Sequence, residues 1–593
     1  MSTPRVCMLA ADGLDPHILV HLVEEGQLPH FRRLMARGFF APMITTYPPV
    51  SPVAWTSLLT GCWPAKHGIL DFIIKAPSAY YPTLGLYDVA RGPAGDAYHS
   101  RRRVPLLNEL LQEYGLKSCL LYLPGTFPPP QEAGHVLSGF GTPDLFGTFG
   151  VPALYTTDRQ ALPAGIRRHP AVHILQAEDS GWRGEFPAPG GRAGVPMTIV
   201  ETPDGVRVQC PAWGTDIHVA EGRWSEWVSL AFTDDRTAAG ICRFYLLSRR
   251  PLVLYRSVVH PDPRRPAVPL SAPPDFAPRL AGECGLFPTA SFPMEQAGYQ
   301  EGLLPAAPFL AGAYAVWEEQ LRLGEHLLAE GGFDLLALHL FTADCVQHFF
   351  WPDAAGRVAE AYRWLDAALG RLSEAAGEEA VIMVVSDHGA APIRYWLHLN
   401  RWLADEGYLA LRADGRIDWR RTRAFCLGYG GIYLNVQGRE PAGVVEPGQP
   451  YEELRRRLMQ ELMALRSPAD GEPVVEWARP RESWHAGPLV PLLPDVMLAL
   501  RPGFALAHED ARGECPADRP WLEPNQSRWR AGHEGPYAPE AVCGVFLAAG
   551  PGIPHGKGNN VHIVDVLPTL CRLWGRPVPA HLDGRPIVII SPQ

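Results

Sequence analysis

The sequence predicts an α/β fold in which helices cover both faces of a mainly parallel sheet. Short apolar segments alternate with segments of helical periodicity up to about residue 123, and again from about residue 311 onward. Between about residues 152 and 292 the helical pattern disappears, and short alternating runs follow one another between turn signals. We therefore expect a core formed by residues 1–151 and 293–593, with a β-rich insertion or cap at residues 152–292.

The first strand of this core is expected at residues 6–11, an apolar run that ends at Asp12. Helices are expected at residues 16–25 and after Pro29, and a second strand is expected at residues 39–45. Ligands of an open α/β sheet bind beyond the carboxyl ends of its strands. Asp12 is therefore the first candidate for a functional side chain.

The segment after the second strand places Ser51 at a turn directly before a helix. Pro48 and Pro49 disfavour helix ahead of Ser51, and Pro52 suits the first helical position. A serine at this position is either a helix cap or a nucleophile at the positive end of the helix dipole. Because a serine nucleophile needs a base or a metal ion to remove its proton, the rest of the sequence has to supply such a group if Ser51 is catalytic.

The remaining elements of the core follow in the same alternation. A helix at residues 104–114 and a strand at residues 117–123 are expected before the insertion. The strongest strand pattern of the chain lies at residues 380–385. The other elements expected after the insertion are helices at residues 311–329, 357–376 and 564–574 and strands at residues 333–340, 431–436, 495–500 and 544–549.

The composition narrows the classes of partner. The 593 residues carry a net charge of −10 and contain no long cluster of lysine and arginine, which argues against nucleic acid or an anionic membrane. The 11 cysteines form no Cys-x-x-Cys pair, so we expect reduced thiols. The first residues lack the pattern of a signal peptide, and no apolar run has the length of a membrane span. We therefore expect a cytoplasmic protein whose main partner is neither nucleic acid nor a membrane, and its oligomeric state is left open.

Three places after the insertion carry side chains that are typical of metal sites. Asp344 and His348 follow a predicted strand and are four residues apart, which puts both on one face of a helix. Asp387 and His388 follow another predicted strand, and His533 lies in a loop. Taken singly, each also fits a chance occurrence or a solvated loop residue. Their shared place near strand ends, together with the two earlier candidates, predicts one common site.

The order and spacing of these motifs extend over most of the chain. They are Asp12, Ser51-Pro-Val-Ala-Trp, Thr60-Gly61, His67-Gly68, Asp344 with His348, Asp387-His388-Gly389, His533 and the closing PVPAHLDG. With these motifs the sequence resembles the alkaline phosphatase superfamily. Within it, the sequence is similar to the type I phosphodiesterase/nucleotide pyrophosphatase branch, which includes a group of phosphohydrolases or phosphomutases.

The resemblance implies an alkaline-phosphatase-like core and the hydrolysis of phosphoric esters. In this scheme Ser51 attacks phosphorus and forms a phosphoseryl intermediate. The resemblance also implies two divalent metal ions, and mixed imidazole and carboxylate ligands favour Zn²⁺, with Mn²⁺ as the second candidate. The family pattern maps one ion to Asp344, His348 and His533, and the other to Asp12, Ser51, Asp387 and His388.

One departure from the family pattern concerns the contacts to the substrate. Nucleotide pyrophosphatases usually carry threonine as the nucleophile and an asparagine on the following helix that holds a phosphate oxygen. Here the nucleophile is Ser51, and residues 51–72 contain no asparagine. Lys66, Arg394 or the backbone N–H groups after Ser51 are the candidates that replace it.

Three alternative functions follow from the same residues. Phosphomonoester hydrolysis or phosphomutase activity is the alternative among enzymes, because cofactor-independent phosphoglycerate mutase also combines a serine nucleophile with a large insertion. A non-catalytic metal-binding module is less consistent with the sequence, since a binder needs no nucleophile. A sulfatase is disfavoured, because Ser51 is not followed by the x-Pro-x-Arg that such enzymes need.

Overall fold

The computed structural model describes residues 4–76, 78–92, 95–188, 194–232, 238–352, 356–483, 486–559 and 561–588. The chain divides into two compact units. The first contains Met1–Asp88, His99–Lys117 and Gly332–Gln593, and the second contains Val89–Tyr98 and Ser118–Gly331.

The centre of the first unit is a sheet whose middle strands are parallel. Strand β1 (Val6–Ala11) pairs in parallel with β22 (Leu335–Leu340) on one side and with β23 (Val381–Val385) on the other. Strand β32 (Gly544–Ala549) runs antiparallel to β23, and β2 (Phe39–Ile44) runs antiparallel to β32. The predicted α/β sheet is confirmed, and the reversed β32 makes it mixed.

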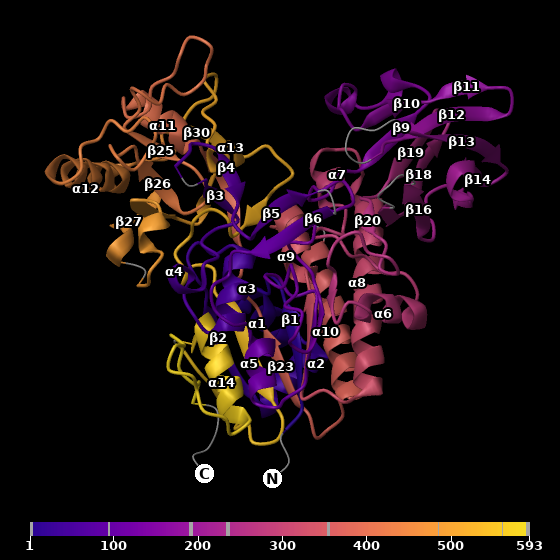
Figure 1. Ribbon diagram of the computed structural model, residues 1–593, viewed down its shortest axis with the longest axis horizontal. Helices are drawn as coiled ribbons and strands as arrows, with labels where there is room; N and C mark the ends of the chain where they lie inside the picture. Colours follow the sequence, from indigo (N-terminus) through magenta and orange to yellow (C-terminus); the bar gives the residue numbers. More distant parts are fainter. Residues whose placement is uncertain are drawn as a thin grey trace. The chain divides into compact units, whose positions relative to one another are not determined.

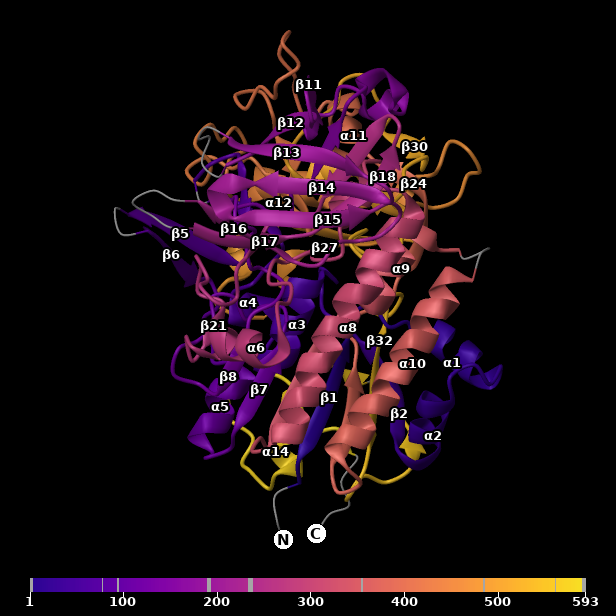
Figure 2. The same cartoon turned by 90° about the vertical axis from the view of Figure 1, so that its right-hand side faces the viewer.

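Helices cover both faces of this sheet. Every residue of β1 is buried, as expected for a strand with helices on both sides. In Figure 1 the strands β1 and β23 lie between α14 on one side and α10 on the other, and Figure 2 shows α10 in front of the strands. The helices of the unit that matter here are α1 (Pro16–Glu24), α2 (Pro29–Arg37), α3 (Ser51–Thr60), α9 (Thr342–Phe350), α10 (Arg357–Ala376) and α14 (Val566–Leu573).

A second set of strands in the first unit lies outside the central sheet. The predicted strands at residues 431–436 and 495–500 form β26 (Gly431–Leu434) and β28 (Val496–Leu500), which pair with each other. They belong to an antiparallel sheet with β25 (Ala424–Cys426) and β27 (Val475–Pro480). A further small sheet contains β24 (Ala391–Leu397), β29 (Gly503–Leu506), β30 (Leu522–Pro524) and β31 (Ala531–Gly532).

The second unit is rich in β structure between residues 153 and 256, where strands β9 to β19 lie. Its largest sheet has the antiparallel order β11-β12-β13-β14-β15, and buried residues such as Phe186, Ile199 and Leu254 form its core. The predicted β-rich segment also contains a helix, α6 (Phe276–Cys284), whose apolar face includes Phe276 and Leu280. Proline-rich sequence on both sides of α6 hid its short helical period. The insertion boundaries at residues 152 and 292 stay a prediction.

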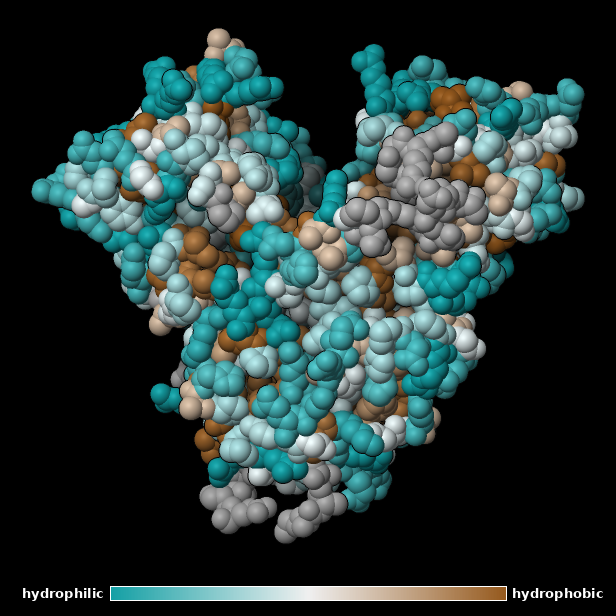
Figure 3. Space-filling view, in the orientation of Figure 1, coloured by the Kyte–Doolittle hydropathy of each residue, from teal (hydrophilic) through white to brown (hydrophobic). Residues whose placement is uncertain are grey.

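No helix in the described ranges combines the length and the apolar composition needed to cross a bilayer. Figure 3 shows a mainly hydrophilic surface on the face in view, where hydrophobic residues occur in separate small patches.

Candidate metal centre and nucleophile

Asp12 lies at the carboxyl end of β1, where the chain turns towards α1. Its backbone N–H donates to the carbonyl oxygen of Leu340 over 3.0 Å, so the pairing of β1 with β22 extends to Asp12 itself. Gly13 follows with φ +66°, and a Cβ at this position would lie 2.6 Å from the Cβ of Asp344. Glycine is therefore required here, because it lets the turn after β1 approach α9 closely.

The Asp12 side chain is fully buried and fixed by two partners that the sequence analysis did not identify. The indole Nε1–H of Trp55 donates to Asp12 Oδ2 over 2.8 Å, and His339 Nε2 lies 2.8 Å from the same oxygen. Burial alone would raise the pKa of Asp12, but the hydrogen bond and charge of His339 lower it. Asp12 is therefore held as a carboxylate with Oδ1 directed away from these two partners.

Ser51 is the first residue of α3, and its hydroxyl does not cap the helix. Val50 occupies the cap position and no side chain makes a capping hydrogen bond. Ser51 Oγ instead donates to Asp12 Oδ1 over 3.4 Å and lies 3.1 Å from His388 Nε2. The structure thus separates the two interpretations of Ser51, because the hydroxyl faces the buried acidic group rather than the backbone of its own helix.

Asp387 and His388 follow β23 and face Asp12. His388 Nε2 lies 3.0 Å from Asp387 Oδ2 and 3.6 Å from Asp12 Oδ1. Asp387 Oδ2 is buried, and its close charged neighbour among the described residues is His388. Burial and the charge of Asp12 raise the pKa of Asp387 to about 6. Burial would lower the pKa of His388, but Asp387 raises it to about 10.

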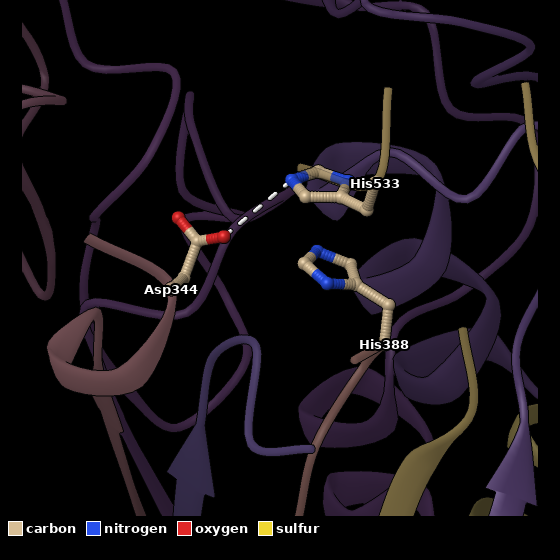
Figure 4. Close-up of side chains that lie close together, drawn as sticks. All are labelled: Asp344, His388 and His533. Atoms are coloured by element: carbon tan, nitrogen blue, oxygen red, sulfur yellow. Dashed lines mark ion pairs between the residues drawn. The ribbon is translucent and has the colours of Figure 1, made fainter. Parts of the chain in front are cut away.

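A second group of side chains gathers around Asp344 of α9. Asp344 Oδ1 lies 3.1 Å from His348 Nε2 and 3.5 Å from His533 Nε2. Figure 4 shows Asp344 facing His533, whose ring stacks on that of His388 with 3.5 Å between the ring centroids. Glu534 joins this group, because its Oε1 lies 3.6 Å from both His348 Nε2 and His533 Nε2.

The buried side chains around Asp344 shift one another's pKa values. Burial alone would lower the pKa of His348, but Asp344 and Glu534 raise it to about 9. Burial lowers the pKa of His533 to about 4. Burial would raise the pKa of Glu534, but His533 and His348 lower it to about 2. At neutral pH and without a metal ion, Glu534 is therefore ionised, His348 is charged and His533 is neutral.

All three histidines are anchored through the same ring nitrogen. Nδ1 lies 2.8 Å from the carbonyl oxygen of Ala531 in His348, 2.9 Å from that of Gly389 in His388 and 2.6 Å from that of Pro49 in His533. A carbonyl oxygen only accepts, so each Nδ1 carries the proton. Nε2 of each ring therefore faces the carboxylates, and it offers a lone pair to a metal ion once it carries no proton. This orientation is typical of histidines that bind a metal ion.

The donor set fits divalent cations. Its ligand atoms form close groups, of which two are Asp12–Asp387–His388 and His348–His533–Glu534. Among the described residues, no lysine or arginine forms an ion pair with any of the carboxylates in these groups or with Asp344. Buried carboxylates need a compensating positive charge, and imidazole and carboxylate ligands together suit Zn²⁺ and similar ions. We call the following residues the strand-end cluster: Asp12, Ser51, Asp344, His348, Asp387, His388, His533 and Glu534.

The structure brings together all seven residues that the sequence analysis assigned to metal binding and nucleophilic attack. In the described part of the chain, neither Lys66 nor Arg394 contacts any of these seven residues. Lys66 Nζ pairs with Asp583 Oδ1 at 2.9 Å, and the Arg394 side chain is 56% exposed on β24. The backbone after Ser51 offers few N–H donors for a phosphate oxygen, because Pro52 has no N–H and the Val53 N–H donates to the carbonyl oxygen of Val50. The substrate contacts therefore stay a prediction.

Three partners of the site escaped the sequence analysis. Glu534 is adjacent to His533, and this adjacency is the signal that could have identified it. Trp55 lies one helical turn after Ser51, so its position on the same face of α3 was readable from the spacing. His339 lies inside the apolar strand β22, where nothing in the sequence distinguishes it from a core residue.

Comparisons with known proteins address the family of this chain. Residues 6–161 and 179–536 match the family described as type I phosphodiesterase / nucleotide pyrophosphatase. No curated protein matches the sequence at a significant level.

Similar solved structures include a phosphonoacetate hydrolase from Sinorhizobium meliloti in complex with phosphonoformate, with 14% identity, 96% coverage of each chain and a TM-score of 0.49. They also include human ectonucleotide pyrophosphatase / phosphodiesterase 5, with 12% identity and a TM-score of 0.44. This match covers 98% of the present chain and 97% of the human chain. A mutant of alkaline phosphatase PafA has 16% identity and a TM-score of 0.47, and the match covers 100% of the present chain and 99% of the PafA chain.

The family match spans most of the chain and includes every residue of the strand-end cluster. The chain therefore belongs to the type I phosphodiesterase / nucleotide pyrophosphatase family, a family of phosphoric ester hydrolases.

Proposed function

We propose that this protein is a two-metal phosphodiesterase or nucleotide pyrophosphatase that acts on a small phosphoric ester through a phosphoseryl intermediate. The observation that carries the proposal is the position of Ser51 Oγ, which lies 3.4 Å from Asp12 Oδ1 and 3.1 Å from His388 Nε2. The hydroxyl is at the start of α3, where the helix dipole favours an anion such as phosphate.

Two groups of residues would hold the ions. Ions bound to them act as Lewis acids that lower the pKa of the Ser51 hydroxyl and stabilise negative charge on the ester oxygens. Zn²⁺ suits the mixed imidazole and carboxylate ligands best, and Mn²⁺ is the alternative. The first group is Asp344, His348 and His533, and the second group is Asp12, Ser51, Asp387 and His388.

The chain's own residues orient the nucleophile. Trp55 and His339 occupy Oδ2 of Asp12, so Oδ1 remains to hold the Ser51 hydroxyl. Ser51 Oγ gives up its proton and attacks phosphorus, the bond from phosphorus to the leaving oxygen breaks, and the leaving group departs as an alcohol that carries this proton. Water then attacks the phosphoserine, and the Ser51 oxygen leaves and regains a proton. Each step exchanges one P–O bond for another.

Hydrolysis of two chromogenic esters tests this function. The protein loaded with Zn²⁺ is expected to hydrolyse bis(p-nitrophenyl) phosphate faster than p-nitrophenyl phosphate, and Ser51→Ala is expected to abolish both activities. Ser57 lies in the same helix, is buried and contacts His67, so Ser57→Ala is the matched control. A serine-dependent preference for the monoester would instead favour the phosphomonoesterase or phosphomutase alternative. Activity that survives Ser51→Ala would contradict the proposal.

A further inference from the structure

Glu534 is a carboxylate of the strand-end cluster that lies outside the ligand pattern transferred from the family. Its Oε1 lies 3.6 Å from His348 Nε2 and 3.6 Å from His533 Nε2, the same two atoms that face Asp344. Its Oε2 accepts the backbone N–H of His533 over 3.2 Å. Glu534 therefore has one oxygen tied to the backbone and the other directed at the Nε2 atoms of the two imidazoles.

The segment before Glu534 is shaped to hold this carboxylate against His348. A Cβ on Gly532 would lie 2.5 Å from Glu534 Oε2 and 3.5 Å from His348 Cε1. The absence of a side chain at Gly532 thus provides the space that the Glu534 carboxylate occupies. Gly532 belongs to β31, which pairs with β24, and the Trp529 ring lies 3.8 Å from the His348 ring. Strand pairing therefore holds the backbone just before Glu534, and ring packing holds His348.

We propose that Glu534 is a fourth protein ligand of the ion held by Asp344, His348 and His533, and that its charge directs the site towards monoanionic phosphodiesters. The inference rests on the proposed function, since it assigns a substrate class to the same site. Carboxylate oxygen is a common ligand of Zn²⁺ beside imidazole nitrogen, and each added charge strengthens the binding of a cation.

The substrate preference follows from the charge of the cluster. With Glu534, the cluster contributes four carboxylates, those of Asp12, Asp344, Asp387 and Glu534, which balance the charge of two divalent ions. Without Glu534, the balance has one positive charge left over. A phosphomonoester carries a charge of about −1.5 to −2 at neutral pH, whereas a diester carries one negative charge. The leftover positive charge would therefore favour the monoester, and Glu534 removes this advantage.

The first test measures metal binding. Isothermal titration of the metal-free protein with Zn²⁺ is expected to show two sites, and Glu534→Gln should weaken one of them at least tenfold. Glu534→Asp, which keeps the charge on a shorter side chain, should weaken the same site less. The control is Glu523→Gln, because Glu523 Oε1 also lies beside a histidine, 3.2 Å from His398 Nε2, and has a side-chain exposure of 24% against 19% for Glu534. Unchanged Zn²⁺ affinity in Glu534→Gln would overturn the assignment of Glu534 as a ligand.

The second test measures the ratio of kcat/KM for bis(p-nitrophenyl) phosphate to kcat/KM for p-nitrophenyl phosphate at saturating Zn²⁺. Glu534→Gln is expected to lower this ratio at least fivefold, while Glu534→Asp and Glu523→Gln keep it near the starting value. An equal ratio in all four proteins would overturn the role of the charge. Thermal unfolding of each variant checks folding, and if Glu534→Gln does not fold, the weaker Zn²⁺ binding of Glu534→Asp decides the assignment.

The two levels of the proposal fail in different ways. If no phosphoric ester is hydrolysed in a Ser51-dependent way, the proposed function fails, and the Zn²⁺ titration still decides whether Glu534 is a ligand. If hydrolysis depends on Ser51 but Glu534→Gln changes neither measurement, the function stands and the inference about Glu534 falls.

Discussion

Two buried acidic sites of the first unit are neutralised in different ways. Asp495 is fully buried, and Arg439 binds both of its oxygens over 2.7 and 2.6 Å. Arg481 adds a further contact to Asp495 at 3.0 Å. The strand-end cluster buries more carboxylates, yet in the described part of the chain none of them pairs with arginine or lysine.

This difference distinguishes a carboxylate that stabilises the fold from carboxylates that bind a ligand. A buried carboxylate with an arginine partner is complete when the chain folds, and its ion pair is part of the fold. A buried group of carboxylates and imidazoles carries protons on Nε2 atoms when no metal ion is bound, and a cation from solution can replace these protons. Asp387 Oδ2 is buried and pairs at 3.0 Å with His388, a residue that is itself able to bind a metal ion, and with no arginine or lysine of the described residues. The following predictions test this difference.

The largest effect is expected from Ser51→Ala. Removal of the nucleophile should lower kcat by about 10³-fold or more, because a nucleophile acts as a unit with the groups that activate it. The content of bound metal should stay nearly unchanged, since the remaining ligands of its ion are intact. Steady-state kinetics and elemental analysis on the same preparation check both parts. Near-normal turnover would remove Ser51 from the chemistry.

His348→Ala is expected to lose about one metal ion per chain. His348 Nε2 faces Asp344 and Glu534, so the change removes a central ligand of one group and leaves the Asp12–Asp387–His388 group intact. His218→Ala is the control, because His218 forms an exposed ion pair with Asp204 at 3.0 Å. Unchanged metal stoichiometry in His348→Ala would show that His348 holds no ion.

Arg439→Ala is expected to destabilise the fold and to spare the metal content. Arg439 pairs with Asp495 and with Glu440, whose side chains are both buried. Breaking a buried ion pair costs up to about 4 kcal/mol, and the remaining contacts of Arg481 with Asp495 and of Lys75 with Glu440 should keep the loss below this limit. Urea unfolding in the presence and absence of Zn²⁺ measures the loss. A loss of bound metal in this variant would show that the two acidic sites are not independent of each other.

Glu295 offers a third kind of buried carboxyl, one that has hydrogen bonds but no ion pair among the described residues. It accepts the Tyr255 hydroxyl over 2.6 Å, and burial raises its pKa from 4.5 to about 7. Since its folded pKa is raised, its contribution to stability is complete below about pH 4.5 and is lost as the pH rises to about 7. The loss amounts to at most about 3 kcal/mol.

The variant Glu295→Gln should lack this part of the pH dependence. Unfolding free energies measured from pH 4.5 to 7.5 compare the variant with the unchanged protein. Parallel pH profiles for the two proteins would show that Glu295 ionises normally in the folded state.

Much of the site was predictable because local rules place it. The alternation of apolar strands and helices located β1 and β32 at the expected residues, 6–11 and 544–549. A spacing of four residues on a helix put Asp344 and His348 together, and the carboxyl ends of neighbouring parallel strands brought Asp12 and Asp387 to one edge.

The remaining features depend on tertiary contacts that no local rule contains. His339 acts on Asp12 only because β22 pairs beside β1, and its sequence context is that of a core strand. The pairing of β26 with β28 outside the central sheet depends on strand partners far apart in sequence. Lys66 and Arg394 lie close in sequence to Ser51 and Asp387, but such closeness does not determine where a long side chain points.

The central claim is that the strand-end cluster takes its positive charge from solution. The most direct test is the number of Zn²⁺ ions per chain after equilibrium dialysis, measured by elemental analysis on the unchanged protein and on a variant that combines Asp344→Asn with Asp387→Asn. We predict two ions per chain for the unchanged protein and fewer than one for the variant. A protein that binds no Zn²⁺, or a variant that binds as much as the unchanged protein, would contradict the claim.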